Sequence, residues 1–190
     1  LMRTFVAGLA FAMPFSLVYQ MMSDRMKGLQ KSEKVIKGLP FAAGFTAGTA
    51  VSIAGNMHYV IYAQIIPLIE KLTGKEVSSY WFPDATRYIG YNPYREEDRT
   101  IHEFPCYSFV LGDLHAHVVN IMFVLLVIAF LYVWLRGVRK KTVPVETSMK
   151  DGKFWKEQLL MPHLLVISAL LGMFQWTNFW DFVIYYVVAC

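Results

Sequence analysis

Acidic and imidazole side chains gather in one short stretch of this chain of 190 residues. The stretch leads directly into an apolar segment, Val118 to Trp134, whose length suits a membrane-spanning helix. Titratable groups at the end of a membrane helix are costly unless they are solvated, paired or used in function. We therefore predict that this junction is the working surface of the protein. The titratable residues concerned are His102, Glu103, Asp113, His115 and His117.

The stretch from Asp113 to His117 has the sharpest spacing, because an aspartate and two histidines alternate with single residues. In an extended strand, His115 and His117 would project from one face and hold a divalent metal ion, with Asp113 as a further ligand. In a helix, residues two apart diverge by about 200°, and Asp113 shares a face with His117 instead. The expected helix disfavours the two-histidine site. In the competing interpretation Asp113 caps the helix and both histidines are interfacial residues.

The remaining candidates also have a structural and a functional interpretation. Glu103 lies at capping-box spacing from a preceding threonine, but a carboxylate there also suits general base chemistry. Asp84 and Arg87 either form a local ion pair or leave Arg87 to bind a phosphate with two hydrogen bonds. Asp181 has helix-capping spacing. Trp180 fits an interfacial aromatic belt, although its ring would equally stack on a sugar.

Composition indicates a membrane protein rather than a soluble enzyme. Hydrophobic residues make up 56% of the chain and charged residues 17%, against about 25% charged residues in soluble domains. The net charge of +4 is concentrated in two short loops, which favours a topological role over nucleic-acid binding. Cys106 and Cys190 lie in unrelated contexts and indicate neither a disulfide framework nor a metal knuckle.

Apolar runs predict an all-α, polytopic membrane helix bundle with about five spans in a single membrane domain over residues 1–190. Because the chain begins and stops inside apolar runs, we expect it to be an internal fragment with a truncated last span. Gly44 and Gly48 form a G-x-x-x-G pair, for which we favour packing inside the protein over dimerisation. The predicted spans cover residues 4–22, 39–56, 118–134, 159–174 and 182–190.

Lysine and arginine residues set the predicted orientation in the cell membrane. Loops 23–38 and 136–158 are basic, which places them in the cytoplasm. Segment 57–117 is then an extracellular loop, and a structureless loop of this length would be unusual. We expect it to contain short interfacial helices, at about 57–72 and 79–89.

Three motifs of the chain are WFPDATRYI at 81–89, IHEFPCYSFVLGDLHAHV at 101–118 and NFWDFVIYY at 178–186. They resemble, in the same order, motifs of the YYY-domain proteins, an integral membrane family of bacteria and archaea. Val183 stands where the family usually has proline, and Cys106 where it has an aromatic or aliphatic residue. Phe82 and Pro83 also separate Trp81 from Asp84.

The YYY-domain family is similar to the C-type membrane glycosyltransferases, which use lipid-phosphate-linked sugars at the outer membrane face. The resemblance implies that the tri-tyrosine stretch, and the usual catalytic base, precede Leu1. It implies sugar transfer from a polyprenyl-phosphate donor in the membrane. The residues that we assign to catalysis are Asp84, Glu103 and Asp113. Those that we assign to substrate binding are Arg87, His115, His117, Trp180 and Asp181.

Two other functions compete with a glycosyltransferase. A transporter or flippase of a lipid-linked or anionic substrate would need ionisable groups deep inside its spans, whereas these lie at span ends. A non-catalytic membrane scaffold would explain the helix caps and the aromatic belt, but not the density of acids and imidazoles.

Overall fold

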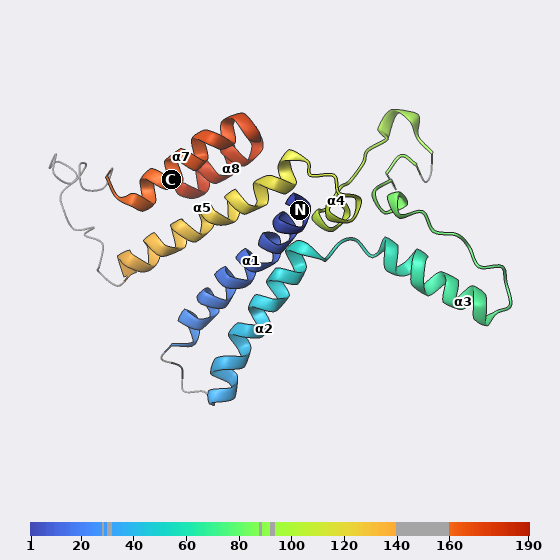
Figure 1. The fold of residues 1–190 in the computed structure, drawn as a ribbon, viewed down its shortest axis with the longest axis horizontal. Helices are drawn as coiled ribbons and strands as arrows, with labels where there is room; N and C mark the ends of the chain where they lie inside the picture. Colours follow the sequence, from blue (N-terminus) through green and yellow to red (C-terminus); the bar gives the residue numbers. More distant parts are fainter. Residues whose placement is uncertain (28, 30–31, 88, 92–93, 140–159) are drawn as a thin grey trace.

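The helices form a bundle with an irregular arm at one end, seen at the right of Figure 1. The computed structural model describes residues 1–27, 29, 32–87, 89–91, 94–139 and 160–190. Helix α1 (Met2–Met26) pairs antiparallel with α2 (Glu33–Ser52), and α5 (Ala116–Arg139) runs in the same direction as α1. Helices α7 (Pro162–Thr177) and α8 (Phe179–Ala189) form a hairpin against α5.

Small residues let α1 and α2 approach closely. Gly44 and Gly48 are buried, and a Cβ added to them would lie 2.8 Å from the carbonyl oxygen of Phe15 and 2.9 Å from that of Phe11. Phenylalanine rings cover the seam, with Phe15 and Phe41 edge to face at 5.7 Å. The glycine pair therefore serves packing inside the chain, in agreement with the favoured interpretation.

The second apolar core lies between α5 and the α7–α8 hairpin. Val127 and Phe174 are fully buried there, with Ile167 and Leu171 almost so. Phe123, Phe130 and Tyr185 pack around this cluster. The core positions of α7 recur every three to four residues, which is the spacing of one helix face.

In segment 53–115 the described residues form short helical pieces joined by irregular chain. The π-helical turn Val60–Ile65 continues into α3 (Ile66–Leu72), which points away from the bundle (Figure 1). Gly74, with φ of 71°, follows its end. Two short 3-10 helices, Phe82–Thr86 and Glu96–Asp98, and then α4 (Pro105–Leu111) complete the segment. Helical pieces thus lie within the ranges 57–72 and 79–89, and their interfacial position stays a prediction.

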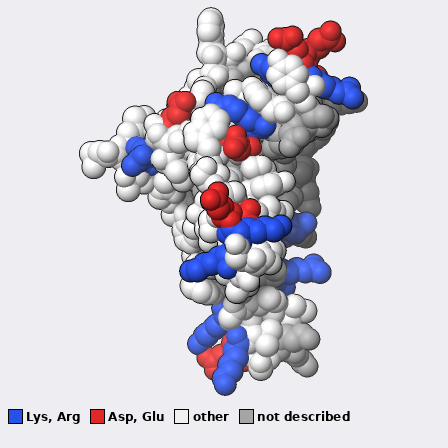
Figure 2. Space-filling model, turned by 90° about the vertical axis from the view of Figure 1, so that its right-hand side faces the viewer, with Lys and Arg blue, Asp and Glu red and all other residues white. Residues whose placement is uncertain are grey.

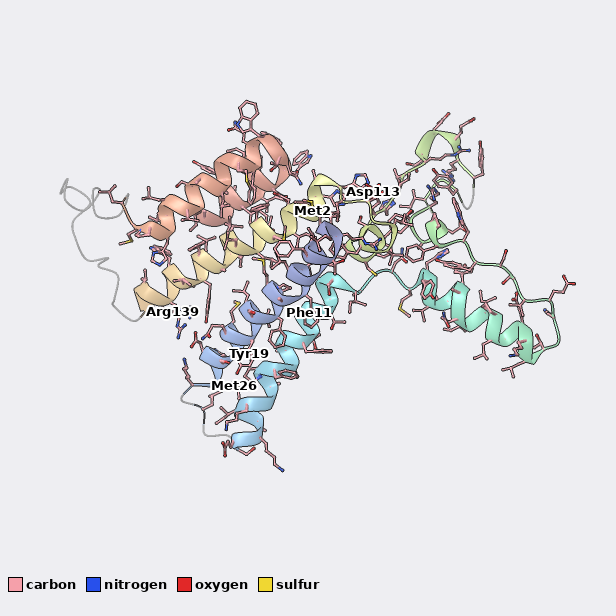
Figure 3. The ribbon with its side chains drawn as sticks, viewed as in Figure 1. Met2, Phe11, Tyr19, Met26, Asp113 and Arg139 are labelled. Carbon is pink, nitrogen blue, oxygen red and sulfur yellow. The ribbon has the colours of Figure 1, made fainter. Side chains whose placement is uncertain are left out.

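A polar cluster joins α1 to α5 at the other end of the bundle. Asp24 accepts a hydrogen bond from the Tyr132 hydroxyl at 2.9 Å and pairs with Nε of Arg136 at 3.0 Å. Lys27 pairs with the same carboxylate at 2.6 Å. Figure 3 shows Met26 and Arg139 toward this end, whereas Met2 and Asp113 lie together at the opposite end. The two basic segments therefore begin at the same end of the molecule.

The observed helices confirm the all-α class and refine the predicted bounds. Helices α1 and α5 are long and apolar enough to cross a membrane, whereas α7 and α8 are shorter apolar helices. Helix α2 begins at Glu33, not at Leu39, and therefore includes Lys34 and Lys37. An ion pair at 2.5 Å between Glu33 and Lys37, one turn apart, favours this additional helical turn. Residues 140–159, with most of the predicted loop 136–158 and the first residue of the fourth predicted span, lie outside the described residues.

Charged side chains on the side of α3 are distributed unevenly. Figure 2 shows red and blue side chains together over the upper part of this face and mostly blue side chains over the lower part.

Candidate functional site

Three side chains from segment 101–117 meet beside the start of α5. Nε2 of His115 lies 2.8 Å from Oδ2 of Asp113 and 3.4 Å from Oε2 of Glu103. The rings of His115 and His117 stack, with centroids 5.6 Å apart and an angle of 19° between their planes. This acid–imidazole cluster, formed by Glu103, Asp113, His115 and His117, can accept, hold and relay a proton.

The backbone explains how these residues come together. Gly112, with φ of 78°, ends α4 in the left-handed region, which side chains other than glycine adopt only with strain. Residues 113–115 belong to no helix, and α5 begins at Ala116. His115 is therefore free of the helical geometry that would have pointed it away from His117. The side chain of Arg3, from α1, packs against this turn. If Gly112 carried a Cβ, that atom would lie 3.0 Å from Nη1 of Arg3.

Both capping interpretations in this region are wrong. Helix α5 begins at Ala116 and the backbone amides of Val118 and Val119 bond to the carbonyl of His115, so Asp113 lies too early to cap it. The N-cap of α4 is Phe104, one residue after Glu103. Both carboxylates instead contact the His115 ring. In the part of the chain that the structure describes, no group of three or more His, Cys, Asp or Glu is arranged to hold a metal ion.

Asp84 and Arg87 line a polar cavity of about 520 Å³. The guanidinium of Arg87 lies over the Trp81 ring, 4.8 Å from its centroid. Its Nη1 is buried and has no hydrogen-bond partner among the described residues, and within the same residues Asp84 and Arg87 form no ion pair. The expected local ion pair is therefore wrong, and a cationic donor remains unused. The cavity is lined by His58, Tyr62, Ser78, Ser79, Tyr80, Asp84, Arg87 and Tyr91.

Tyr80 gives this cavity a neutral hydroxyl. Burial raises the pKa of the Tyr80 phenol, and the negative charge of Asp84 and the nearby Tyr59 raise it further. The phenol therefore stays protonated well above neutral pH. Its oxygen lies 3.2 Å from Nδ1 of His58, whose ring stacks on Tyr62 at 4.4 Å. The cavity thus combines aromatic faces with hydrogen-bonding groups.

Backbone contacts bring the cavity and the acid–imidazole cluster onto neighbouring segments. The backbone amide of His102 donates a hydrogen bond to the carbonyl of Thr86 at 3.0 Å. Arg87 follows Thr86 directly and Glu103 follows His102 directly, so this bond connects the segment of the cavity with the segment of the cluster. Asn56 donates to the carbonyl of Ala85 at 2.5 Å, which ties the same segment to the end of α2. Ala85 and Thr86 are fully buried.

Asp181 lies at the junction of α5 and α8. Its Oδ2 accepts hydrogen bonds from Nδ2 of Asn120 at 2.5 Å and from Nδ2 of Asn178 at 3.0 Å. Asn178 is the N-cap of α8, so the prediction that Asp181 caps this helix is wrong. Asn120 is 2% exposed and follows His117 by one helical turn. Trp180 is 73% exposed, and its recorded ring contact is with Phe179 at 6.4 Å.

The bond between Asn120 and Asp181 should couple the two residues energetically. We expect a double-mutant cycle with Asn120→Ala and Asp181→Ala to give a coupling energy of about 1–3 kcal/mol, because Asp181→Ala leaves the buried Asn120 amide without this partner. The measurement is unfolding of the purified protein in detergent, with Asn178→Ala as the comparison for the second bond to Asp181. Strictly additive effects of the two substitutions would contradict a direct coupling.

The predicted site residues thus form three groups around one end of the bundle. Asp84 and Arg87 share a cavity, Glu103 and Asp113 share His115, and Asp181 is linked to α5 through Asn120. Trp180 joins none of the three groups in the described contacts. Asn120, a single amide in an apolar run, and His58 were not among the predicted site residues.

These helices and the polar groups at their end define the chain as an all-helical membrane protein. The chain belongs to a family described as uncharacterized membrane protein (DUF2298), whose model matches residues 1–190. No curated protein and no solved structure matches it.

Proposed function

We propose that this chain is part of a membrane glycosyltransferase that transfers a sugar from a polyprenyl-phosphate donor at the outer membrane face. The observation that carries the proposal is the cavity lined by Arg87, Asp84 and several aromatic residues, in which Nη1 of Arg87 has no hydrogen-bond partner among the described residues. Guanidinium groups bind phosphate oxygens through two parallel hydrogen bonds. Aromatic faces and a carboxylate suit a sugar.

The proposed orientation follows from charge. We place the end with Lys27, Arg136 and Arg139 in the cytoplasm, because basic residues next to spans stay on that side. The opposite end, which contains Asp84 and Asp113, then faces outward. In this proposal α2, α7 and α8 also cross the membrane, for about five spans in all.

An inverting sugar transfer needs a group that accepts the acceptor's proton and a cation that stabilises the departing phosphate. The acceptor oxygen bonds to the anomeric carbon as the bond from that carbon to the donor phosphate oxygen breaks. A carboxylate takes the acceptor proton, and a cation stabilises the departing phosphate. In this proposal Arg87 is the cation that stabilises the phosphate, and Asp84, Glu103 or Asp113 is the carboxylate that takes the proton.

The acid–imidazole cluster gives the direct test. Replacing Glu103 or Asp113 with alanine in the full-length protein should lower the rate of sugar transfer about 100-fold or more, as expected for loss of general acid–base assistance. The assay follows transfer from a synthetic polyprenyl-phosphate sugar in proteoliposomes. Glu97→Ala is the matched control, because Glu97 is an exposed acid of the same segment.

Two results would contradict the proposal. One is undiminished transfer by both the Glu103 and the Asp113 variants. The other is movement of the lipid-linked sugar across the bilayer by the unmodified protein without cleavage of the sugar–phosphate bond, which would favour a flippase.

A further inference from the structure

A basic cavity of about 300 Å³ lies where α1 and α5 end together, remote from the proposed sugar site. Lys27, Arg136 and Arg139 contribute positive charge, whereas Asp24 is the only carboxylate among the described residues that line it. Asp24 already pairs with Lys27 and Arg136. The lining therefore keeps an excess of positive charge. The six lining residues are Asp24, Lys27, Tyr132, Leu135, Arg136 and Arg139.

An apolar groove of about 370 Å³ runs between α1 and α5 and meets this cavity. Tyr132 lines both, so the groove leads to the basic residues. The groove covers Ala12 to Gln20 on α1 and Leu125 to Val133 on α5. At about 1.5 Å of rise per residue, each stretch advances about 12 Å.

This length is close to that of one lipid leaflet. The hydrocarbon core of a bilayer is about 30 Å thick, so one leaflet contributes about 15 Å. A groove that is one leaflet deep and ends in cations matches an acyl chain attached to an anionic headgroup. Basic pockets between membrane helices are known to hold anionic lipid headgroups at the cytoplasmic side.

We propose that the groove between α1 and α5 holds one acyl chain of an anionic phospholipid whose headgroup phosphate binds Arg136, Arg139 and Lys27. The lipid fills the seam between the two longest apolar helices and neutralises the excess charge at their ends. This site is separate from the proposed sugar site and does not depend on it.

The test titrates the full-length protein in detergent with phosphatidylglycerol, phosphatidylcholine or inorganic phosphate, and counts bound lipid by native mass spectrometry. We expect one phosphatidylglycerol to bind in preference to phosphatidylcholine. Arg139→Gln should weaken this binding about fivefold, the value of one basic residue near an anionic lipid. Lys34→Gln is the matched control, because Lys34 is an exposed cation in the first turn of α2, outside the cavity.

A second variant tests the groove. Ala129→Phe places a ring in the groove without changing charge, and it should weaken phosphatidylglycerol binding while the melting temperature without lipid stays near that of the unmodified protein. Equal binding of phosphatidylcholine, equal effects of Arg139→Gln and Lys34→Gln, or full binding by Ala129→Phe would each overturn the proposal. An equal rise of the melting temperature with inorganic phosphate and with phosphatidylglycerol would also overturn the proposal, because the site would then bind a free anion.

Discussion

Replacing Arg87 with methionine should lower kcat/KM for sugar transfer about 100- to 1000-fold, which is the usual cost of removing one group that stabilises developing negative charge. Methionine keeps the apolar contact with Trp81 but removes every donor. Since the buried Nη1 of Arg87 has no partner among the described residues, its removal should leave the melting temperature unchanged or raise it. Activity and stability should therefore move independently.

Two comparisons sharpen this prediction. Arg87→Lys should recover little activity, because an ammonium cannot form the two parallel bonds of a guanidinium. Arg95→Gln, which changes an exposed arginine a few residues further along, should transfer sugar normally. A melting temperature that falls in proportion to activity would show that Arg87 is structural and would remove the main support for the proposed function.

The second large effect is expected at the seam between α1 and α2. Gly48→Leu and Gly44→Leu should each destabilise the protein by about 1–3 kcal/mol, and the double variant should fail to keep the two helices packed. The added Cβ would lie under 3.0 Å from a backbone oxygen of α1 at both positions. Such a contact is relieved only by moving a whole helix, since the oxygen belongs to the backbone.

Gly38→Leu is the matched control for this prediction. Gly38 lies in the same helix, and nothing lies within 4 Å of a Cβ added to it. Leucine is the better helix former, so this variant should be as stable as the unmodified protein or more so, by up to about 1 kcal/mol. Unfolding in detergent, followed by circular dichroism, compares the four variants with the unmodified protein. Equal loss of stability at Gly38 and Gly48 would contradict the role of close helix approach.

Long apolar runs made the main helices predictable. The segments predicted at 4–22 and 118–134 became α1 and α5, which extend a few residues further at both ends. The ends of the helices were harder to predict, because Lys and Arg occur both in loops and in the first and last turns of helices. Arg136 and Arg139 lie inside α5, and Lys34 and Lys37 lie inside α2. The number of membrane crossings stays a prediction.

The site was predictable by residue type more than by geometry. The motifs identified Glu103, Asp113 and His115, but the expected helix placed the imidazoles on different faces. In the structure residues 113–115 belong to no helix, since Gly112 ends α4 and α5 begins at Ala116. Whether His115 and His117 can stack therefore depends on the residue at which α5 begins, and the spacing of residues in a sequence does not determine a helix end to within one or two residues.

Asn120 shows a further limit of the sequence. One amide among apolar residues has no local partner to identify its role, and its bond is with Asp181, 61 residues later. Similarly, the pairing of Thr86 with His102 depends on how segment 53–115 folds back on itself. Contacts between distant parts of a chain follow from packing, which a single sequence does not display.

The cluster around Asp24 has a consequence for biogenesis. The hairpin of α1 and α2 is complete once residue 52 is synthesised, but Tyr132 and Arg136 emerge about 80 residues later, which takes about 4–16 s at ordinary translation speeds. During that delay Asp24 has only neighbours from its own helix end, and Lys27, three residues away, already pairs with it. In the nascent hairpin this carboxylate is thus already paired with Lys27 before α5 is synthesised and joins it.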